Sequence, residues 1–342
     1  MRSLFTPLRL AGALLGLVVV AVIVLYLVPS NDYLLLPDKA HPVAPLVEVQ
    51  GGKDPVGPGG IYFVDVFERR ASMLESLFPW IHDGATLVPA SLIVPPGVND
   101  KAARQADLRQ MSISQRVAAA VALRQLGFKV VARPSGVIVA ALDTRSHAVG
   151  KLRPTDVIIR VNGAPTPTIG KLRTQLAKVR PGGVVTLRIS RGTVANAGTT
   201  LVVRVQTLAD PANPKRAIVG FAPEQAAEIK LPRKVSIDAG GVGGPSAGLA
   251  FALEVMQELG RNVDHGYKVA ATGEIELDGT VTPIGGVRQK IFGVRESGAD
   301  VFLVPAGDNA AVARRYAGGV RIIPVKTFPQ ALRALATLPA RG

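Results

Sequence analysis

A serine at the start of an apolar segment is the first group in the sequence that could do chemistry. Ser246 stands in the motif Gly243-Gly244-Pro245-Ser246-Ala247-Gly248, and the following residues, LAFALEVMQEL, predict a helix over 246–259. A hydroxyl there lies at the positive end of the helix dipole, beside N–H groups that have no partner inside the helix. Such donors can stabilise an oxyanion, and Gly244 and Gly248 would let a substrate backbone come close. The alternative interpretation is an ordinary serine cap.

A lysine farther along the chain could serve that serine as a base. Lys290 falls in a helix predicted over 287–297, where Val287, Ile291 and Val294 share one apolar face and Lys290 borders it. An amine that faces the interior loses solvation, which lowers its pKa from about 10.4 and favours the neutral form that a general base needs. The alternative is a lysine whose stem lies along the apolar face while its amine reaches solvent.

A threonine completes the group. Thr272 lies in Ala271-Thr272-Gly273-Glu274-Ile275 at the end of a predicted strand, and its hydroxyl could orient an amine. Composition excludes other sites: there is no cysteine, and none of the four histidines lies in an H-E-x-x-H pair. The Gly-Lys pair that ends at Lys171 lacks the spacing of a P-loop. Hydrolysis would therefore use serine, threonine, lysine or carboxylates, with no metal or other cofactor.

Taken together, the three motifs resemble the proteolytic domain of Lon-type Ser-Lys peptidases over residues 217–338. The G-P-S-A-G, T-G-E-I and P-I-G-G-V-x-x-K motifs occur in that family's order and at closely similar spacing. The resemblance implies that Ser246 is the nucleophile, that Lys290 is the general base and that Thr272 positions Lys290. It also implies that the backbone around Ser246 binds the oxyanion and the substrate backbone, at Gly244, Pro245, Ala247 and Gly248. Many Lon proteases have Asp three residues before the nucleophile, whereas this chain has Gly243.

The elements that would position these residues alternate between strands and helices, which is typical of an α/β or α+β domain. Strands are predicted at 217–221, 234–237, 267–273, 281–284, 301–304 and 320–325. Helices are predicted at 246–259, 287–297, 308–316 and 328–337.

Residues 128–208 predict a compact β-rich module that resembles a bacterial-type PDZ domain. The matching pieces are Gly136-Val137-Ile138-Val139, the segment 151–158 (KLRPTDVI) and Val161-Asn162-Gly163, with Thr155 where the family often has Gly. The resemblance implies that a peptide adds as a strand along Gly136, Val137, Ile138 and Val139, opposite a helix predicted over 168–179. The alternative is that Gly136 only begins a core strand.

The positive charge is concentrated around this module. The 342 residues carry 40 Lys and Arg against 25 Asp and Glu, a net charge of +15. Residues 128–208 hold 13 basic and 2 acidic residues, whereas residues 235–342 hold 11 and 10. Phe128 is the only aromatic residue of the module, which argues against stacking on single-stranded nucleic acid. Acidic or free C-terminal peptide ends, or anionic lipid headgroups, suit the charge better, and a solvated surface is the alternative.

The N-terminal region contains a long apolar run. Residues 10–28 carry no charge, Arg2 and Arg9 precede them, and the next basic residue is Lys39. This pattern predicts a transmembrane anchor with residues 1–9 in the cytoplasm and the bulk outside, in a bacterial cell membrane. A cleaved signal peptide is the alternative. Residues 31–127 are predicted to form a tether and a small extracytoplasmic α/β segment.

The sequence therefore predicts a multidomain α+β protein with an N-terminal transmembrane helix, a small α/β segment, a PDZ-like module and a C-terminal Lon-type proteolytic α/β domain. The expected function is that of an ATP-independent, membrane-anchored serine endopeptidase acting on protein or peptide substrates. The PDZ module would deliver substrate or inhibit the site until a peptide binds. A PDZ scaffold with a weak or silent Lon-like domain is the alternative. Nucleic acid is not an expected partner, and the resemblance also implies a homo-oligomer.

Overall fold

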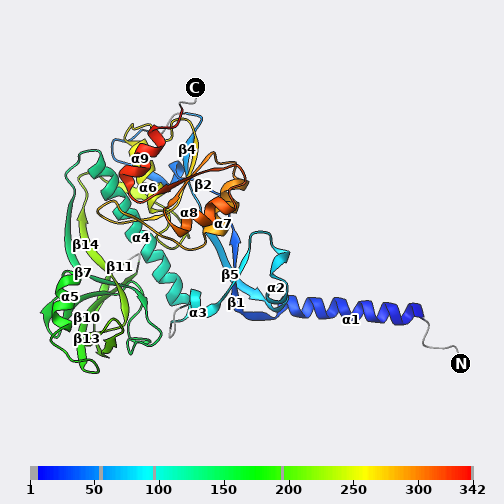
Figure 1. The fold of residues 1–342 in the computed structure, drawn as a ribbon, viewed down its shortest axis with the longest axis horizontal. Helices are drawn as coiled ribbons and strands as arrows, with labels where there is room; N and C mark the ends of the chain where they lie inside the picture. Colours follow the sequence, from blue (N-terminus) through cyan, green and yellow to red (C-terminus); the bar gives the residue numbers. More distant parts are fainter. Residues whose placement is uncertain (1–6, 54–56, 95–97, 194–195, 340–342) are drawn as a thin grey trace.

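A computed structural model describes residues 7–53, 57–94, 98–193 and 196–339. Helix α1 (Pro7–Leu27) projects away from an α/β body and a β-rich module, which are joined by long continuous elements (Figure 1).

The α/β body is built on a sheet with the strand order β2-β4-β16-β19-β20. Its strands are β2 (His41–Pro42), β4 (Gly60–Phe63), β16 (Lys268–Ala271), β19 (Val301–Pro305) and β20 (Arg321–Val325). The last four are mutually parallel, and β2 pairs antiparallel to β4 at one edge. Two of the five strands precede the PDZ-like region in sequence, so two distant stretches of chain build this sheet.

Helices cover both faces of that sheet. Because side chains alternate along a strand, Val269 and Leu303 enter one core while Ala270 and Phe302 enter the other. The first core holds α6 (Gly248–Glu258) and α9 (Phe328–Ala336), and the second holds α7 (Val287–Glu296) and α8 (Asp308–Arg315). Every residue of α6 is buried, so this helix is the centre of the body.

Smaller elements surround the body. A three-stranded sheet has the order β5-β1-β6, and three two-stranded sheets pair β3 with β15, β12 with β13, and β17 with β18. These strands are β1 (Pro29–Pro37), β3 (Val47–Val49), β5 (Val66–Ser72), β6 (Thr86–Pro89), β12 (Leu208–Asp210), β13 (Asn213–Ile218), β15 (Val235–Ile237), β17 (Glu274–Ile275) and β18 (Val281–Thr282). The short helices are α2 (Met73–Leu77) and α3 (Ala90–Ile93), with 3-10 turns at Ala44–Leu46 and Pro79–Ile81.

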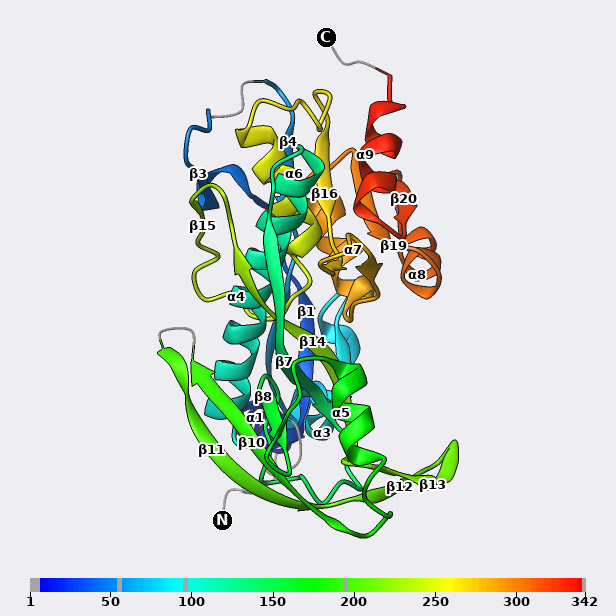
Figure 2. The ribbon, with the colours of Figure 1, turned by 90° about the vertical axis from the view of Figure 1, so that its left-hand side faces the viewer.

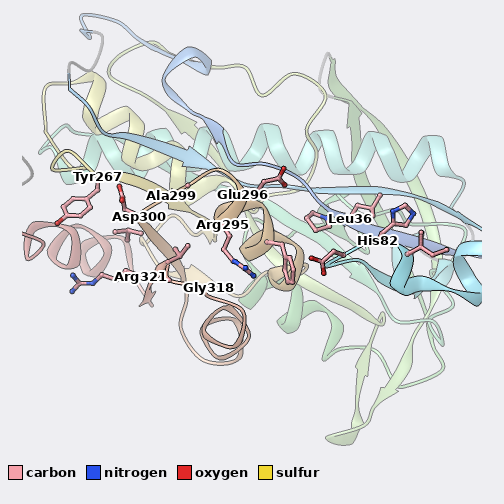
Figure 3. A pocket seen from close by; sticks show the side chains of 17 residues that line it. Leu36, His82, Tyr267, Arg295, Glu296, Ala299, Asp300, Gly318 and Arg321 are labelled. Atoms are coloured by element: carbon pink, nitrogen blue, oxygen red, sulfur yellow. The ribbon is translucent and has the colours of Figure 1, made fainter.

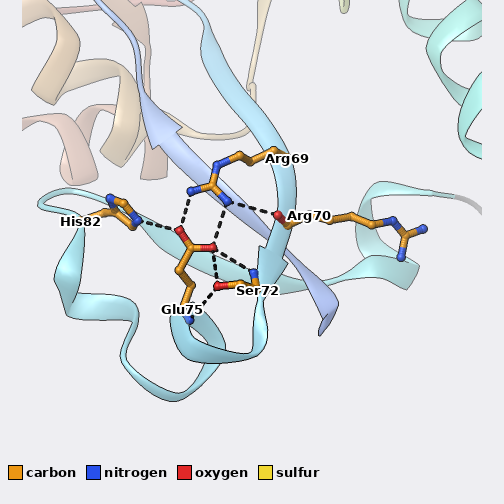
Figure 4. Close-up of polar contacts among 5 residues, drawn as sticks. All are labelled: Arg69, Arg70, Ser72, Glu75 and His82. Carbon is orange, nitrogen blue, oxygen red and sulfur yellow. Dashed lines mark hydrogen bonds and ion pairs between the residues drawn. The ribbon is translucent and has the colours of Figure 1, made fainter. Parts of the chain in front are cut away.

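A buried carboxylate fixes the turn after β5 (Figure 4). Ser72 and Glu75 form a capping box at the start of α2, in which Glu75 Oε2 accepts a hydrogen bond from Ser72 N at 2.9 Å. Arg69 donates to both carboxylate oxygens of Glu75, and His82 Nε2 lies 2.8 Å from Oε1. The Arg69 guanidinium holds the pKa of Glu75 well below its usual range. Glu75 therefore remains charged although it is buried, and it ties three segments together.

The β-rich module is a sheet of order β11-β10-β8-β7-β14, with β9 paired to β8, and one helix. Its elements are β7 (Val131–Leu142), β8 (Val157–Val161), β9 (Ala164–Pro165), α5 (Ile169–Leu176), β10 (Val184–Thr193), β11 (Asn196–Gln206) and β14 (Phe221–Lys230). Leu172 and Leu176 of α5 pack onto Val137, Ile158 and Leu187 of the sheet in a separate core.

Three long elements run between the module and the body: α4 (Asp100–Gln125), β7 and β14 (Figure 2). Asn99 caps α4 by accepting a hydrogen bond from Ala102 N at 2.8 Å. A run of buried alanines in α4, residues 118–120 and 122, lets this helix pack closely against α6.

The prediction of a transmembrane anchor over residues 10–28 is wrong, and so is the predicted single-pass location in a bacterial cell membrane. Among the described residues, no helix is long and apolar enough to cross a membrane. Most of the segment 1–9, predicted as cytoplasmic, lies outside the described residues.

Candidate active site

The structure brings Ser246 and Lys290 into direct contact. Lys290 Nζ donates a hydrogen bond to Ser246 Oγ at 2.9 Å and a second one to the backbone oxygen of Val64 at 2.6 Å. Lys290 is only 3% exposed, so water does not compete strongly for its amine. Of the two sequence-based interpretations of Lys290, the buried lysine is correct and the solvent-reaching one is wrong.

Burial changes the proton affinity of this amine. Loss of solvation lowers the pKa of Lys290 from 10.5 to about 8, although the carboxylates of Asp65 and Glu68 act in the opposite direction. A lysine with that pKa is partly neutral near neutral pH, so it can accept a proton from a hydroxyl.

Helix α7 positions Lys290 against the end of β4. The helix starts after Gly286, whose φ of +68° suits glycine, and its residues Ile291 and Val294 are fully buried. Val64 directly follows β4, which places its carbonyl beside the lysine amine. No sequence motif pointed to Val64, because a backbone carbonyl leaves no signal in residue type.

Ser246 lies in the serine loop, which we define as residues 241–247 between β15 and α6. Gly244 adopts a φ of +80°, a conformation that favours glycine. The carbonyl oxygen of Ser246 accepts hydrogen bonds from Gly273 N at 2.8 Å and from Thr272 Oγ1 at 3.1 Å. Thr272 was expected to position Lys290, but its described hydrogen bond goes to the Ser246 backbone.

Two amides at this position could bind an oxyanion. In the part of the chain that the structure describes, the N–H groups of Ser246 and Ala247 donate to no protein acceptor. Both precede the first residue of α6, where the helix dipole adds positive potential.

Glycine was predicted at positions 244 and 248 to admit a substrate backbone, but the structure gives other reasons for glycine at both positions. Gly244 is needed for its positive φ, and a Cβ there would meet open space. At Gly248 a Cβ would lie 2.7 Å from Ser114 Oγ and 3.0 Å from Ile275 Cγ2. Gly248 therefore lets α4 and β17 approach the start of α6.

The predicted peptide-binding strand is an inner strand. Gly136, Val137, Ile138 and Val139 lie in β7, with β8 on one side and β14 on the other. Around Val137 to Val139 this strand is paired on both sides, so a peptide could add there only by displacing a neighbouring strand. The alternative interpretation of Gly136 as part of a core strand fits this placement.

A groove of about 190 Å³ lies instead between α5 and the β13–β14 turn. Its apolar lining includes Leu172, Leu176 and Phe221, and Arg173 and Arg216 also line it. Strand β14 is one of the two edge strands of the described sheet, and it begins at Phe221 beside this groove, so its outer edge could take an added strand.

A larger cavity, of about 1200 Å³, lies elsewhere (Figure 3). Leu36, Phe292, Arg295, Gly318 and Arg321 are among its lining residues, and Ser246, Lys290 and Thr272 are not. It is therefore separate from the candidate active site.

One group of side chains has the composition of a cation site. Potential ligand atoms of Asp38, His41 and Asp65 lie within 4.8 Å of one another. His41 Nε2 lies 3.6 Å from Asp38 Oδ2 and 3.7 Å from Asp65 Oδ1, and these contacts account for the grouping without a metal.

Comparisons with known proteins match both regions. The family model described as "Lon protease (S16) C-terminal proteolytic domain" matches residues 226–337, and the PDZ domain model matches residues 116–190. Lon protease 2 of Bacillus subtilis is 37% identical over 111 residues, which cover 32% of this chain and 19% of that protein. Lon protease 1 of Sorangium cellulosum is 38% identical over 106 residues, which cover 28% and 13%.

The chain thus spans less than a fifth of the length of these curated relatives. Among solved structures, the PDZ domain of an SdrC-like protein from Listeria monocytogenes matches with 14% identity and a TM-score of 0.23. That match covers 26% of this chain and 87% of the other. The matched family models and the named relatives agree with the geometry around Ser246: the chain carries a serine-peptidase domain of the Lon type together with a PDZ domain.

Proposed function

We propose that this protein is an endopeptidase that cleaves peptide bonds with a Ser246–Lys290 dyad. The observation that carries the proposal is the 2.9 Å contact between Lys290 Nζ and Ser246 Oγ in a site where the lysine is buried. A buried amine of lowered pKa next to a hydroxyl is the arrangement that activates a serine without histidine.

The reaction follows from these contacts. Neutral Lys290 takes the Ser246 hydroxyl proton while Oγ attacks the substrate carbonyl carbon. The N–H groups of Ser246 and Ala247 stabilise the negative oxygen of the tetrahedral intermediate. Lys290 then gives its proton to the leaving amine as the peptide bond breaks. Lys290 then takes a proton from a water molecule that attacks the acyl-enzyme, and returns it to Ser246 Oγ as the ester bond breaks, which restores the serine and the neutral lysine.

The dyad needs neither nucleotide nor metal for any of these steps. The sequence contains no P-loop spacing, which supports hydrolysis that does not depend on ATP. We therefore expect equal rates of peptide cleavage with and without ATP and Mg²⁺.

The groove beside α5 supports a role in recognising protein substrates. Its apolar residues could hold the last side chain of a peptide, while Arg173 and Arg216 attract the terminal carboxylate. The peptide would add as a strand to the outer edge of β14. This location replaces the one predicted along Gly136 to Val139.

The dyad is tested by removing the serine hydroxyl. Ser246→Ala is expected to abolish both cleavage of a fluorogenic peptide and labelling by a fluorophosphonate probe, because both need the Oγ nucleophile. Ser236→Ala, on β15 outside the site, is the matched control and should retain both. Undiminished cleavage by Ser246→Ala would refute the proposal.

The groove is tested by reversing one charge. Arg173→Glu is expected to weaken binding of a peptide with a free C-terminal carboxylate by about ten-fold, because a close opposite charge is replaced by a repulsive one. Lys171→Glu is the control, since Lys171 is exposed on the same helix but does not line the groove. Fluorescence anisotropy in the Ser246→Ala background measures both. Equal affinities for Arg173→Glu and Lys171→Glu would contradict this location.

A further inference from the structure

Helix α4 contains none of the three catalytic motifs, but it contacts the serine loop through three hydrogen bonds. Gly244 N donates to the backbone oxygen of Asp107 at 2.9 Å, and Arg104 Nη2 donates to the backbone oxygen of Gly241. About two turns after Asp107 on α4, Ser114 Oγ donates to the backbone oxygen of Pro245 at 2.9 Å. Ser114 is only 4% exposed.

The Ser114 contact acts on the peptide group that contains the Ser246 amide. In a trans peptide, C=O and N–H point in opposite directions, and no described residue has a cis peptide bond. The hydrogen bond that fixes the Pro245 oxygen toward α4 therefore also fixes the direction in which the Ser246 N–H points. We propose that Ser114 is a positioning residue that aims the Ser246 N–H at the oxyanion of the reaction.

The other side of Ser246 has a matching arrangement. Thr272 Oγ1 and Gly273 N hold the Ser246 carbonyl, which fixes the direction of the Ala247 N–H in the same way. A buried hydroxyl therefore fixes the orientation of each of the two peptide groups whose N–H donors have no acceptor among the described residues. Thr272 comes from the strand end that the motifs identified, whereas Ser114 comes from α4, just before the residues that match the PDZ family model.

Gly248 makes room for this contact. A Cβ at position 248 would come within 2.7 Å of Ser114 Oγ, so any other residue would force the hydroxyl away from its place. Pro245 O also accepts a weaker contact from Gly248 N at 3.2 Å, which alone would hold the peptide less firmly.

The inference rests on the proposed peptidase function, and its test is a change in kcat. Ser114→Ala is expected to lower kcat for a fluorogenic peptide about ten-fold or more and to leave KM unchanged, because an oxyanion donor acts mainly in the transition state. The affinity for a peptide aldehyde should fall by the same factor as kcat/KM. Ser246 Oγ adds to the aldehyde carbon and its proton passes to Lys290, so the adduct carries the same negative oxygen.

Ser112→Ala is the matched control, because Ser112 is on the same helix, is half-buried and has no hydrogen bond among those described for the chain. It should leave kcat unchanged. If Ser114→Ala does not fold, Ser114→Cys keeps a similar volume with a much weaker donor and should show the same loss.

Two results would overturn the inference while Ser246→Ala remains inactive. One is an unchanged kcat in folded Ser114→Ala, and the other is a raised KM with unchanged aldehyde affinity. Cleavage that persists in Ser246→Ala would instead refute the proposed function itself, so the two failures are distinguishable.

Discussion

Replacing Lys290 with methionine is expected to lower kcat/KM for peptide cleavage by at least about 1000-fold, because Ser246 Oγ loses the base to which it is hydrogen-bonded. Methionine has a similar length and no charge, so it can fill the buried channel that the lysine occupies. The carbonyl of Val64 loses its 2.6 Å hydrogen bond, but the protein no longer buries an ionisable amine. We therefore expect a melting temperature at pH 7 close to, or above, that of the wild type.

The pH dependence of kcat/KM in the wild-type enzyme should follow the ionisation of Lys290. Cleavage requires neutral Lys290, whose pKa burial lowers to about 8, so kcat/KM should rise as pH increases through about 8 and then level off. The folded-state pKa lies below the unfolded value of 10.5, so the unfolded chain binds more protons between these values. Stability should consequently rise with pH over that window, and this rise should be absent in Lys290→Met.

Lys268→Met is the matched control for both measurements. Lys268 is an exposed lysine on β16, and its replacement should change neither the rate nor its pH profile. A folded Lys290→Met enzyme with a tenth or more of wild-type activity would show that another group accepts the serine proton.

The sequence predicted the parts of the site that depend on local patterns. Ser246, Thr272 and Lys290 each stand in a short motif at an element boundary, where glycine and proline mark the turns. The structure places Ser246 beside both of the other residues. Helix α7 begins at the predicted residue, Val287, because an apolar face of period 3.6 follows a pair of glycines.

The sequence analysis missed the site residues that come from segments distant in sequence from the three motifs. Val64 contributes a backbone carbonyl, and Ser114 stands among polar residues of α4 with nothing in its neighbours to mark it. Both lie within residues 31–127, for which the sequence predicted only a tether and a small α/β segment. Tertiary contacts of this kind leave no periodic signal, so only the fold reveals them.

Strand β14 was missed for a different reason. Its sequence, FAPEQAAEIK, contains a proline, two glutamates and three alanines, which are all infrequent in strands. The predicted strand over 217–221 also crosses the turn at Gly220, whose φ is +83°. Without β14, strand β7 looked like an open edge, and for that reason the sequence predicted peptide binding along it; the structure pairs β7 with β14.

Replacing Gly293 with alanine is expected to destabilise the protein by about 3 kcal/mol or more and to reduce peptide cleavage in parallel. In a helix, alanine is more favourable than glycine by about 1 kcal/mol, so helix propensity alone predicts that Gly293→Ala stabilises α7. Here, however, a Cβ at position 293 would lie 1.6 Å from the backbone oxygen of Asp38. The backbone oxygen of Asp38 cannot rotate away as a flexible side chain can. The steric clash should therefore outweigh the gain in helix propensity.

The segment after β1 is also fastened to α7 beside this glycine. Ala40 N donates to Ser297 Oγ at 2.7 Å, and Ser297 Oγ donates to the Gly293 carbonyl at 2.8 Å. To accommodate the methyl group, α7 must move away from this segment and carry Lys290 with it, one turn earlier on the same helix. The contacts of Lys290 with Val64 and Ser246 would lengthen, so we expect kcat to fall even at temperatures where the variant is folded.

Gly170→Ala in α5 is the matched substitution, since a Cβ there would meet only Thr168 Oγ1, at 3.9 Å. It should raise the melting temperature slightly or leave it unchanged, whereas Gly293→Ala should lower it by about 10 °C or more, given the several degrees per kcal/mol typical of domains of this size. Thermal unfolding and peptide cleavage, measured on both variants, check the two parts of the prediction. If Gly293→Ala were as stable and as active as Gly170→Ala, close packing of α7 on the residue 38 backbone could not be what holds Lys290 in place.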